Sequence, residues 1–249
     1  MENSRYIRDD RSESFELLGD MSAAIAKSSG GIDVDSTTLH RWRDSMGLLR
    51  EFDTLVDDGE VSAEESLDLL RDFDYFKDRY PSLNRDNLSD EARGLMVARV
   101  AYILALGDGI STTKSVDDFM YYRTEEADHS ALLLSDIATE YVRGQDGFED
   151  RFIPTMQTLA RTANYLDSIF DYRQDVADGK VEIEASAELF TRLGRGAIRG
   201  FMVATPRLMR PKVLKGFADM SIMRARNRII HGSTPYSSAN NIKPVASRD

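Results

Sequence analysis

The scarcity of proline is the sequence feature that most constrains the fold of this 249-residue chain. Only six prolines occur, and long stretches contain none. The six are Pro81, Pro154, Pro206, Pro211, Pro235 and Pro244. A proline inside a helix breaks or kinks it, so the stretches between these residues can form long helices. Apolar residues recur there at three- and four-residue intervals, as at Leu39, Trp42 and Met46, and strand-like alternation is rare. The sequence therefore predicts an all-α fold, a single bundle of about eight helices.

Capping residues and helix breakers set the limits of the predicted helices. Ser62 and Glu65 fit a capping box, and Gly30 with Gly31 ends the first helix. The eight predicted helices span approximately residues 12–28, 36–59, 62–80, 89–107, 115–142, 148–176, 184–204 and 211–231. They form one domain over residues 1–231, and the polar residues 232–249 are predicted to be a disordered tail.

The chain contains no cysteine, which excludes disulfides, thiolate metal sites and a thiol nucleophile. Its first residues show neither the apolar region nor the cleavage site of a secretory signal. A run of about 18 apolar residues, which a membrane-spanning helix would need, is also missing from the sequence. We therefore expect a cytoplasmic protein with no integral membrane segment.

Acidic and basic side chains are unevenly distributed along the chain, whose formal net charge is −11. Residues 191–249 carry a net charge of +10, and residues 1–190 carry −21. An acidic body is a poor match for nucleic acid, so we expect no nucleic-acid partner. The basic end could bind an anionic partner, fold back over the acidic body, or surround a small anionic ligand, and charge alone leaves these uses open.

Two groups of aspartates occur at intervals that place side chains on one face of a helix. In the first group, Asp53 and Asp57 stand near the end of a predicted helix and Asp58 follows. Like charges four residues apart destabilise a helix, and the C-terminal end of a helix disfavours anions. The arrangement therefore costs stability unless a divalent cation binds between the carboxylates. The alternative is a solvated acidic face.

The second group is a ladder of Asp167, Asp171 and Asp175, each four residues after the one before, with Asn164 beside it. The three aspartates drift by about 80° around a helix, so they remain on one side. Hard oxygen ligands of this kind suit Mg²⁺, which takes a few carboxylates, several waters and substrate phosphates. The two groups, on two long helices, could face each other across the bundle.

The ladder and its continuation resemble a motif of the class I isoprenoid synthase superfamily. Asp171-x-x-x-Asp175 followed by Gly179-Lys180 is similar to the second aspartate-rich motif of squalene and phytoene synthases. There the two aspartates lie on a long helix and a glycine–basic pair follows. The neighbourhood of Asn164 also looks like part of the metal triad of terpene cyclases.

The resemblance extends to two regions nearer the N-terminus. Asp53-x-x-x-Asp57-Asp58 is similar to the first aspartate-rich motif of the same superfamily. Arg123 precedes the second motif and looks like the diphosphate-sensing arginine that bacterial terpene cyclases carry on the preceding helix. The order of the motifs along the chain is therefore that of the superfamily.

Membership in this superfamily would imply helices around a central cavity and an allylic prenyl diphosphate as substrate. The implied cofactor is Mg²⁺, bound as three ions. The implied metal ligands are Asp53, Asp57, Asp58, Asn164, Asp167, Asp171 and Asp175. The implied diphosphate ligands are Arg123, Arg173, Lys180, Arg224, Arg226 and Arg228. Arg123 and Tyr122 would act in catalysis. The residues Phe52, Phe119 and Phe170 would line the pocket, unless these aromatics are ordinary core residues.

The implied enzyme is a lyase that cyclises one prenyl chain or a transferase that condenses two. Two other functions use the same features. A helical binding or assembly protein could keep this fold without catalysis, and an all-α diphosphate hydrolase could use the same acids to hold metal. A homodimer is compatible with each of these functions.

Overall fold

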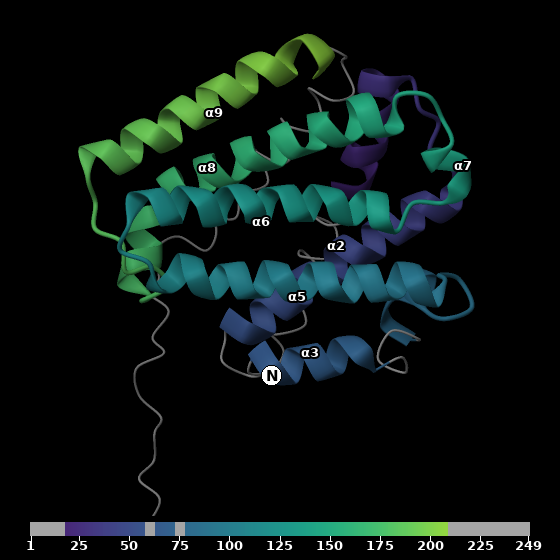
Figure 1. The fold of residues 1–249 in the computed structure, drawn as a ribbon, viewed down its shortest axis with the longest axis horizontal. Helices are drawn as coiled ribbons and strands as arrows, with labels where there is room; N and C mark the ends of the chain where they lie inside the picture. The colour runs from purple at the N-terminus through teal and green to yellow at the C-terminus, as the bar shows by residue number, and fades with distance from the viewer. Residues whose placement is uncertain (1–17, 58–62, 73–77, 209–249) are drawn as a thin grey trace, which may run out of the picture.

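Helices make up most of the computed structural model, which describes residues 18–57, 63–72 and 78–208 (Figure 1). No strand occurs within these ranges. The predicted all-α fold is therefore confirmed. The predicted helix over residues 211–231 and the predicted tail of residues 232–249 lie outside the described residues.

Residues 18–30 form the first described helix. The elements that follow are α2 (Ser36–Asp57), α3 (Ala63–Arg71), η1 (Pro81–Leu83), α5 (Asp90–Thr112), α6 (Val116–Asp136), α7 (Glu140–Arg143), η2 (Phe148–Phe152), α8 (Ile153–Ala177) and α9 (Ala187–Leu208). Serine side chains cap two of the long helices, as the sequence predicts. Ser89 accepts a hydrogen bond from the N–H of Ala92 at 3.2 Å, and Ser115 accepts one from the N–H of Asp118 at 3.3 Å.

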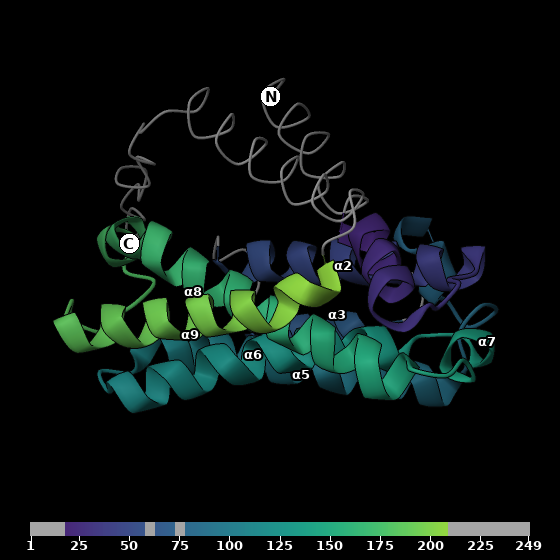
Figure 2. The same cartoon turned by 90° about the horizontal axis from the view of Figure 1, so that it is seen from above.

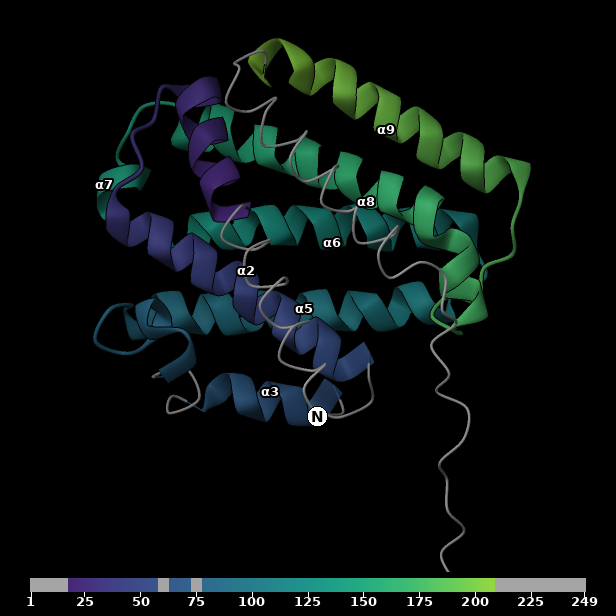
Figure 3. The same cartoon turned by 180° about the vertical axis from the view of Figure 1, so that it is seen from behind.

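Four long helices, α5, α6, α8 and α9, lie side by side in one layer, and each runs antiparallel to the next (Figure 1). α2 crosses one face of this layer, and α3 lies along the outer edge of α5 (Figure 3). From above, α2 and the helix of residues 18–30 lie on the same side of the layer (Figure 2). α8 ends at one end of the bundle, whereas α2 ends closer to its middle (Figures 1 and 3).

Two apolar clusters hold these helices together. The larger one includes Trp42, whose ring stacks on Phe152 at 5.3 Å and whose indole N–H donates to the carbonyl oxygen of Leu134 at 2.9 Å. The smaller one joins α6, α8 and α9 and includes Phe119 and Leu189. Because the smaller cluster reaches the C-terminal half of α8, it supports the helix that carries the acid ladder.

α9 meets α8 at two glycines that leave room for α8 side chains. A Cβ at Gly200 would lie 2.1 Å from Oγ1 of Thr162, and a Cβ at Gly196 would lie 2.6 Å from the ring of Tyr165. Any larger residue at either position would push the two helices apart. The close contact fixes one side of α8 against α9 and leaves a different side to α6.

The third predicted helix is interrupted. α3 ends at Arg71 and Asp72 is not helical, whereas the prediction ran without a break to about residue 80; residues 78–79 are helical again. The N–H of Asp72 bonds to the carbonyl oxygens of Asp68 and Leu69, which closes the last turn. Asp72 at this end is unfavourable for a longer helix, because the C-terminal end of a helix disfavours a carboxylate.

The fourth predicted helix is longer than expected, since α5 passes Gly107 and ends at Thr112. Gly109 lies where α5 meets α6, and a Cβ there would be 3.0 Å from the ring of Tyr122. The glycine therefore serves a close contact inside the helix instead of ending it. The N–H of Thr113 then donates to the carbonyl oxygen of Gly109 and completes the last turn.

The fifth predicted helix is divided, because α6 ends at Asp136 and α7 begins at Glu140. Between them, the N–H of Thr139 donates to Oγ1 of Thr38 at 3.1 Å, and the Thr139 hydroxyl donates to Oδ2 of Asp35 at 2.8 Å. These bonds tie the break to the start of α2. Helical periodicity along the sequence carries no sign of such a tertiary contact.

By length and composition, α5 could cross a membrane, with a mean hydropathy of 1.4 over its most apolar window. Core helices of soluble proteins meet the same criteria, and α5 packs between α3 and α6 (Figure 1). The absence of an integral membrane segment therefore stays a prediction.

Candidate functional site

The tertiary structure brings Arg123 of α6 next to Asn164 of α8, one turn before the acid ladder. Both side chains are partly buried between the two helices. The amide nitrogen of Asn164 lies 3.4 Å from the carbonyl oxygen of Arg123 and donates a hydrogen bond to it. A predicted diphosphate ligand and a predicted metal ligand therefore meet, although 41 positions separate them in the chain.

Glu126 joins these two side chains and was not among the predicted site residues. Its Oε2 accepts a hydrogen bond from Nη1 of Arg123 at 3.1 Å and one from Nδ2 of Asn164 at 2.9 Å. Both described side-chain hydrogen bonds of Asn164 use its amide nitrogen, so the amide oxygen is the side-chain atom that this residue can offer to a cation. The sequence held one signal for Glu126, its position three residues after Arg123 on the same face of a helix.

Arg123 is packed on one side and incompletely bonded. Its guanidinium lies over the ring of Phe119 at 5.6 Å from the ring centroid. Its Nε is buried and has no hydrogen-bond partner among the described residues. A buried donor without a partner is costly, so an anionic ligand oxygen that accepted from Nε would stabilise the site.

Asp175, the last residue of the acid ladder, is partly buried near other carboxylates. Burial raises the pKa of the Asp175 carboxyl, and the neighbouring carboxylates of Asp171 and Asp178 raise it further. The cations Arg123 and Lys180 oppose this rise in pKa. Repulsion between carboxylates in a partly buried place is the condition that a bound divalent cation relieves.

Several predicted residues have less defined surroundings. The backbones of Asp53 and Asp57 belong to the last turns of α2, and their side chains are outside the described part of the structure. The residues Asp58, Arg224, Arg226 and Arg228 are outside it entirely. Asp167 and Asp171 are partly buried on α8, and Arg173 and Lys180 are exposed. The meeting of the two acid groups therefore stays a prediction.

The predicted pocket aromatics lie in different surroundings. Phe52 is fully buried in the larger apolar cluster, and Phe119 is buried in the smaller one beneath Arg123. Phe170 is 64% exposed. Tyr122, predicted to act in catalysis, packs its ring against α5 at Gly109. Of these four side chains, only Phe119 has a described contact with Arg123.

A magnesium ion fits the donor atoms of this site by their chemistry. No group of three His, Cys, Asp or Glu side chains that could hold a metal occurs within residues 18–57, 63–72 and 78–208. Mg²⁺ does not require such a group, because one or two carboxylates with waters and substrate phosphates satisfy it. Asp171, Asp175 and the amide oxygen of Asn164 are hard donors of this kind.

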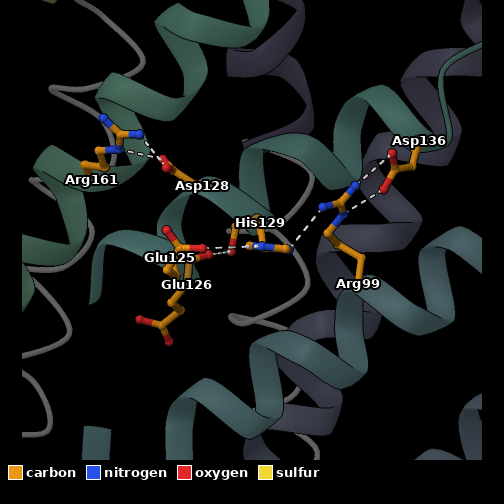
Figure 4. A network of polar contacts seen from close by, with 8 residues as sticks. Arg99, Glu125, Glu126, Asp128, His129, Asp136 and Arg161 are labelled. Carbon is orange, nitrogen blue, oxygen red and sulfur yellow. Dashed lines mark hydrogen bonds and ion pairs between the residues drawn. The ribbon is translucent and has the colours of Figure 1, made fainter. Parts of the chain in front are cut away.

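A second polar cluster ties α6 to its two neighbours (Figure 4). Arg99 of α5 forms a two-pronged ion pair with Asp136 of α6, with nitrogen–oxygen distances of 2.8 and 3.1 Å. Arg161 of α8 pairs in the same way with Asp128 of α6, and this bonding raises the pKa of the Arg161 guanidinium. Both pairs are internally satisfied, so this cluster fixes the helices and is not a ligand site.

His129 lies within this cluster as a neutral side chain. Its Nδ1 faces Nη1 of Arg99 at 3.0 Å, so Nδ1 accepts and the ring proton is on Nε2, which faces Glu125. Burial lowers the pKa of His129, and the positive charge of Arg99 lowers it further. The carboxylates of Glu125, Asp128 and Asp136 oppose the shift in pKa.

This environment predicts a pH dependence of stability. The unfolded chain takes up the His129 proton more readily than the folded protein, so folding stability decreases as pH falls below about 6.5. We expect His129→Gln to reduce this loss, because glutamine can accept from Arg99 without titrating. Urea unfolding at several pH values measures the effect. His40→Gln, at an exposed position of α2, is the control and should behave like the wild type.

Comparison with known proteins finds no matching family model, no matching curated protein and no matching solved structure.

Proposed function

We propose that this chain is a Mg²⁺-dependent class I isoprenoid synthase that ionises an allylic prenyl diphosphate and then cyclises or condenses it. One observation carries the proposal. Arg123 is partly buried beside Asp175 of the carboxylate ladder, and its Nε has no hydrogen-bond partner in the part of the chain that the structure describes. Glu126 holds this arginine together with an amide that can bind a cation. A site where groups that bind a cation lie next to a group that binds an anion suits a metal-bound diphosphate.

The residues of the site have separate tasks in this reaction. When bound, Mg²⁺ would neutralise the negative charge that develops on the leaving diphosphate. Asp171 and Asp175, one turn apart on α8, would hold one ion, and Asn164, two turns before Asp171, would serve a different ion. Arg123 would donate hydrogen bonds from its guanidinium to diphosphate oxygens, and the ring of Phe119 supports that guanidinium from one face.

Glu126 is a positioning residue in this proposal. Glu126→Ala removes the acceptor that orients both Arg123 and Asn164, so we expect kcat/KM to fall by roughly 10- to 100-fold, as for other outer-shell carboxylates. The apparent affinity for Mg²⁺ should weaken in the same variant, which a purely structural role would not cause. Glu188→Ala, at an exposed carboxylate of α9, is the control and should retain wild-type values.

The proposal is tested by incubating the protein with geranyl, farnesyl and geranylgeranyl diphosphates and Mg²⁺. Gas chromatography of the extract should show a cyclised or condensed hydrocarbon, and inorganic diphosphate should be released. A prenyl alcohol as the sole product would assign a hydrolase instead. No turnover of any of the three substrates would contradict the proposed enzyme.

A further inference from the structure

α9 is the outermost helix of the layer and presents large apolar side chains on its outer side (Figure 1). Its inner side carries Leu189, Leu193 and Ala197, which are buried in the smaller apolar cluster. On the opposite side, Ile198 is 63% exposed and Met202 is 65% exposed. Both sides of α9 are therefore apolar, although only the inner one is covered by the bundle.

Two arginines lie beside these exposed apolar side chains. Arg195 precedes Ile198 by three residues and Arg199 precedes Met202 by three, so the four side chains share one side of the helix. Both arginines are exposed, and neither forms a hydrogen bond or an ion pair within the described part of the chain. Like charges four residues apart destabilise a helix unless anions balance them. We call these four residues the α9 outer side.

We propose that the α9 outer side binds the surface of an anionic lipid bilayer, with α9 lying parallel to the membrane plane. Ile198 and Met202 enter the boundary between headgroups and acyl chains, and Arg195 and Arg199 pair with lipid phosphates. Phe201, which is 61% exposed, adds apolar surface next to Met202. The chain is attached to the membrane surface in this arrangement, and α9 does not cross the bilayer.

The distribution of charge favours an anionic surface at this place. Residues 191–208 contain four arginines and no acidic residue, and residues 209–249 contain eight basic and two acidic residues, a net charge of +6. Glu188, in the first turn of α9, pairs with Arg192, which also pairs with Asp117 of α6. Glu188 precedes the exposed apolar side chains by about 15 Å along the helix, farther than the ~8 Å over which charges act at physiological salt. The α9 outer side is therefore a positive region of an acidic protein.

The same features disfavour other partners. In a contact between two copies about a two-fold axis on this side, the arginines of one copy would lie against those of the other. Nucleic acid would place Ile198 and Met202 against a phosphate backbone, which offers them no apolar surface. A folded acidic protein would need a groove that matches a convex helix, because protein interfaces depend on shape complementarity. A fluid bilayer adapts to a convex helix without such a groove.

Flotation of the full chain with lipid vesicles tests the proposal. The protein should float with vesicles of equal parts phosphatidylcholine and phosphatidylglycerol, and it should not float with phosphatidylcholine alone. Arg195→Gln and Arg199→Gln should each weaken binding about 5-fold, the effect of one basic residue near an anionic surface. Lys114→Gln removes one positive charge from an exposed position between α5 and α6, and this control should bind like the wild type.

A double variant tests the apolar part of the contact. Ile198→Ser combined with Met202→Ser should weaken binding at least about 10-fold, because less apolar surface enters the bilayer. Circular dichroism should stay unchanged, since both residues are exposed. Leu95→Ser combined with Ala98→Ser changes exposed positions of α5, away from α9 across the layer, and should bind like the wild type (Figure 1).

The absence of cysteine allows a single position to carry a fluorescent probe. A nitrobenzoxadiazole group on Met202→Cys should shift its emission to shorter wavelength when the phosphatidylglycerol vesicles are added, because the probe leaves water. The same probe on Ala98→Cys of α5 should keep its emission wavelength. A shift at Ala98→Cys without one at Met202→Cys would overturn the proposed orientation.

Three other results would overturn the proposal. The first is a wild type that binds neither kind of vesicle, and the second is equal binding to both kinds. The third is unchanged binding of the Ile198→Ser and Met202→Ser double variant, which would assign binding to the basic residues 209–249 instead of α9. None of these measurements depends on enzymatic activity, so they are independent of the proposed function.

Discussion

Asp171→Asn should lower the rate of diphosphate release from a prenyl substrate by at least about 100-fold, the scale of losing one electrostatic contact to a transition state. The substitution keeps the size of the side chain and removes its negative charge. Asp171 lies in the middle of the ladder, and its charge acts on Asp175. The loss should come from weaker metal binding, so raising the Mg²⁺ concentration should restore part of the rate.

Two controls separate this effect from damage to the fold. Asp150→Asn changes an exposed aspartate of η2, at the other end of the same helical run, and should retain full activity. Mg²⁺ with inorganic diphosphate should raise the melting temperature of the wild type through ligand linkage and should fail to do so for Asp171→Asn. Full activity of Asp171→Asn would remove the ladder from the proposed mechanism.

Trp42→Ala should destabilise the protein by about 3–5 kcal/mol, the range for truncating a fully buried large aromatic. Trp42 has no exposed surface, stacks on Phe152 and donates to the carbonyl oxygen of Leu134. The substitution therefore leaves a cavity in the larger cluster and an unsatisfied carbonyl oxygen. Urea unfolding followed by far-ultraviolet circular dichroism measures the loss.

Trp42→Phe divides this effect into two parts. Phenylalanine keeps an aromatic ring beside Phe152 but cannot donate to Leu134, so we expect a smaller loss of about 1–3 kcal/mol. Equal stabilities for Trp42→Ala and the wild type would show that the cluster around Trp42 does not hold α2 to the bundle.

The acid ladder was predictable because its spacing is a property of one helix. Asp167, Asp171 and Asp175 share a side of α8 through helical geometry alone, and α8 forms as predicted, after a short π-helical start at η2. The importance of Glu126 was not predictable in the same way. It depends on α6 lying against α8, which brings Glu126 to Asn164 across 38 positions of sequence.

The aromatic residues show the same difference between what one helix specifies and what contacts between helices specify. Phe52 and Phe170 both stand between acids at helical spacing, and the sequence does not distinguish them. In the bundle, Phe52 is fully buried in the larger cluster and Phe170 is 64% exposed. The side of a helix that is buried depends on the neighbouring helices, which a single helical period does not specify.

Local sequence patterns sufficed to predict that this chain is helical, where most of its helices lie, and that the aspartates of α8 form a one-sided ladder. These properties depend on residues within about two turns of each other. Packing between helices explains why α5 continues through Gly109, why a break follows Asp136, and why Arg123, Glu126 and Asn164 meet. Those outcomes depend on contacts between helices, whose free energies arise from packing and charge across distant parts of the chain.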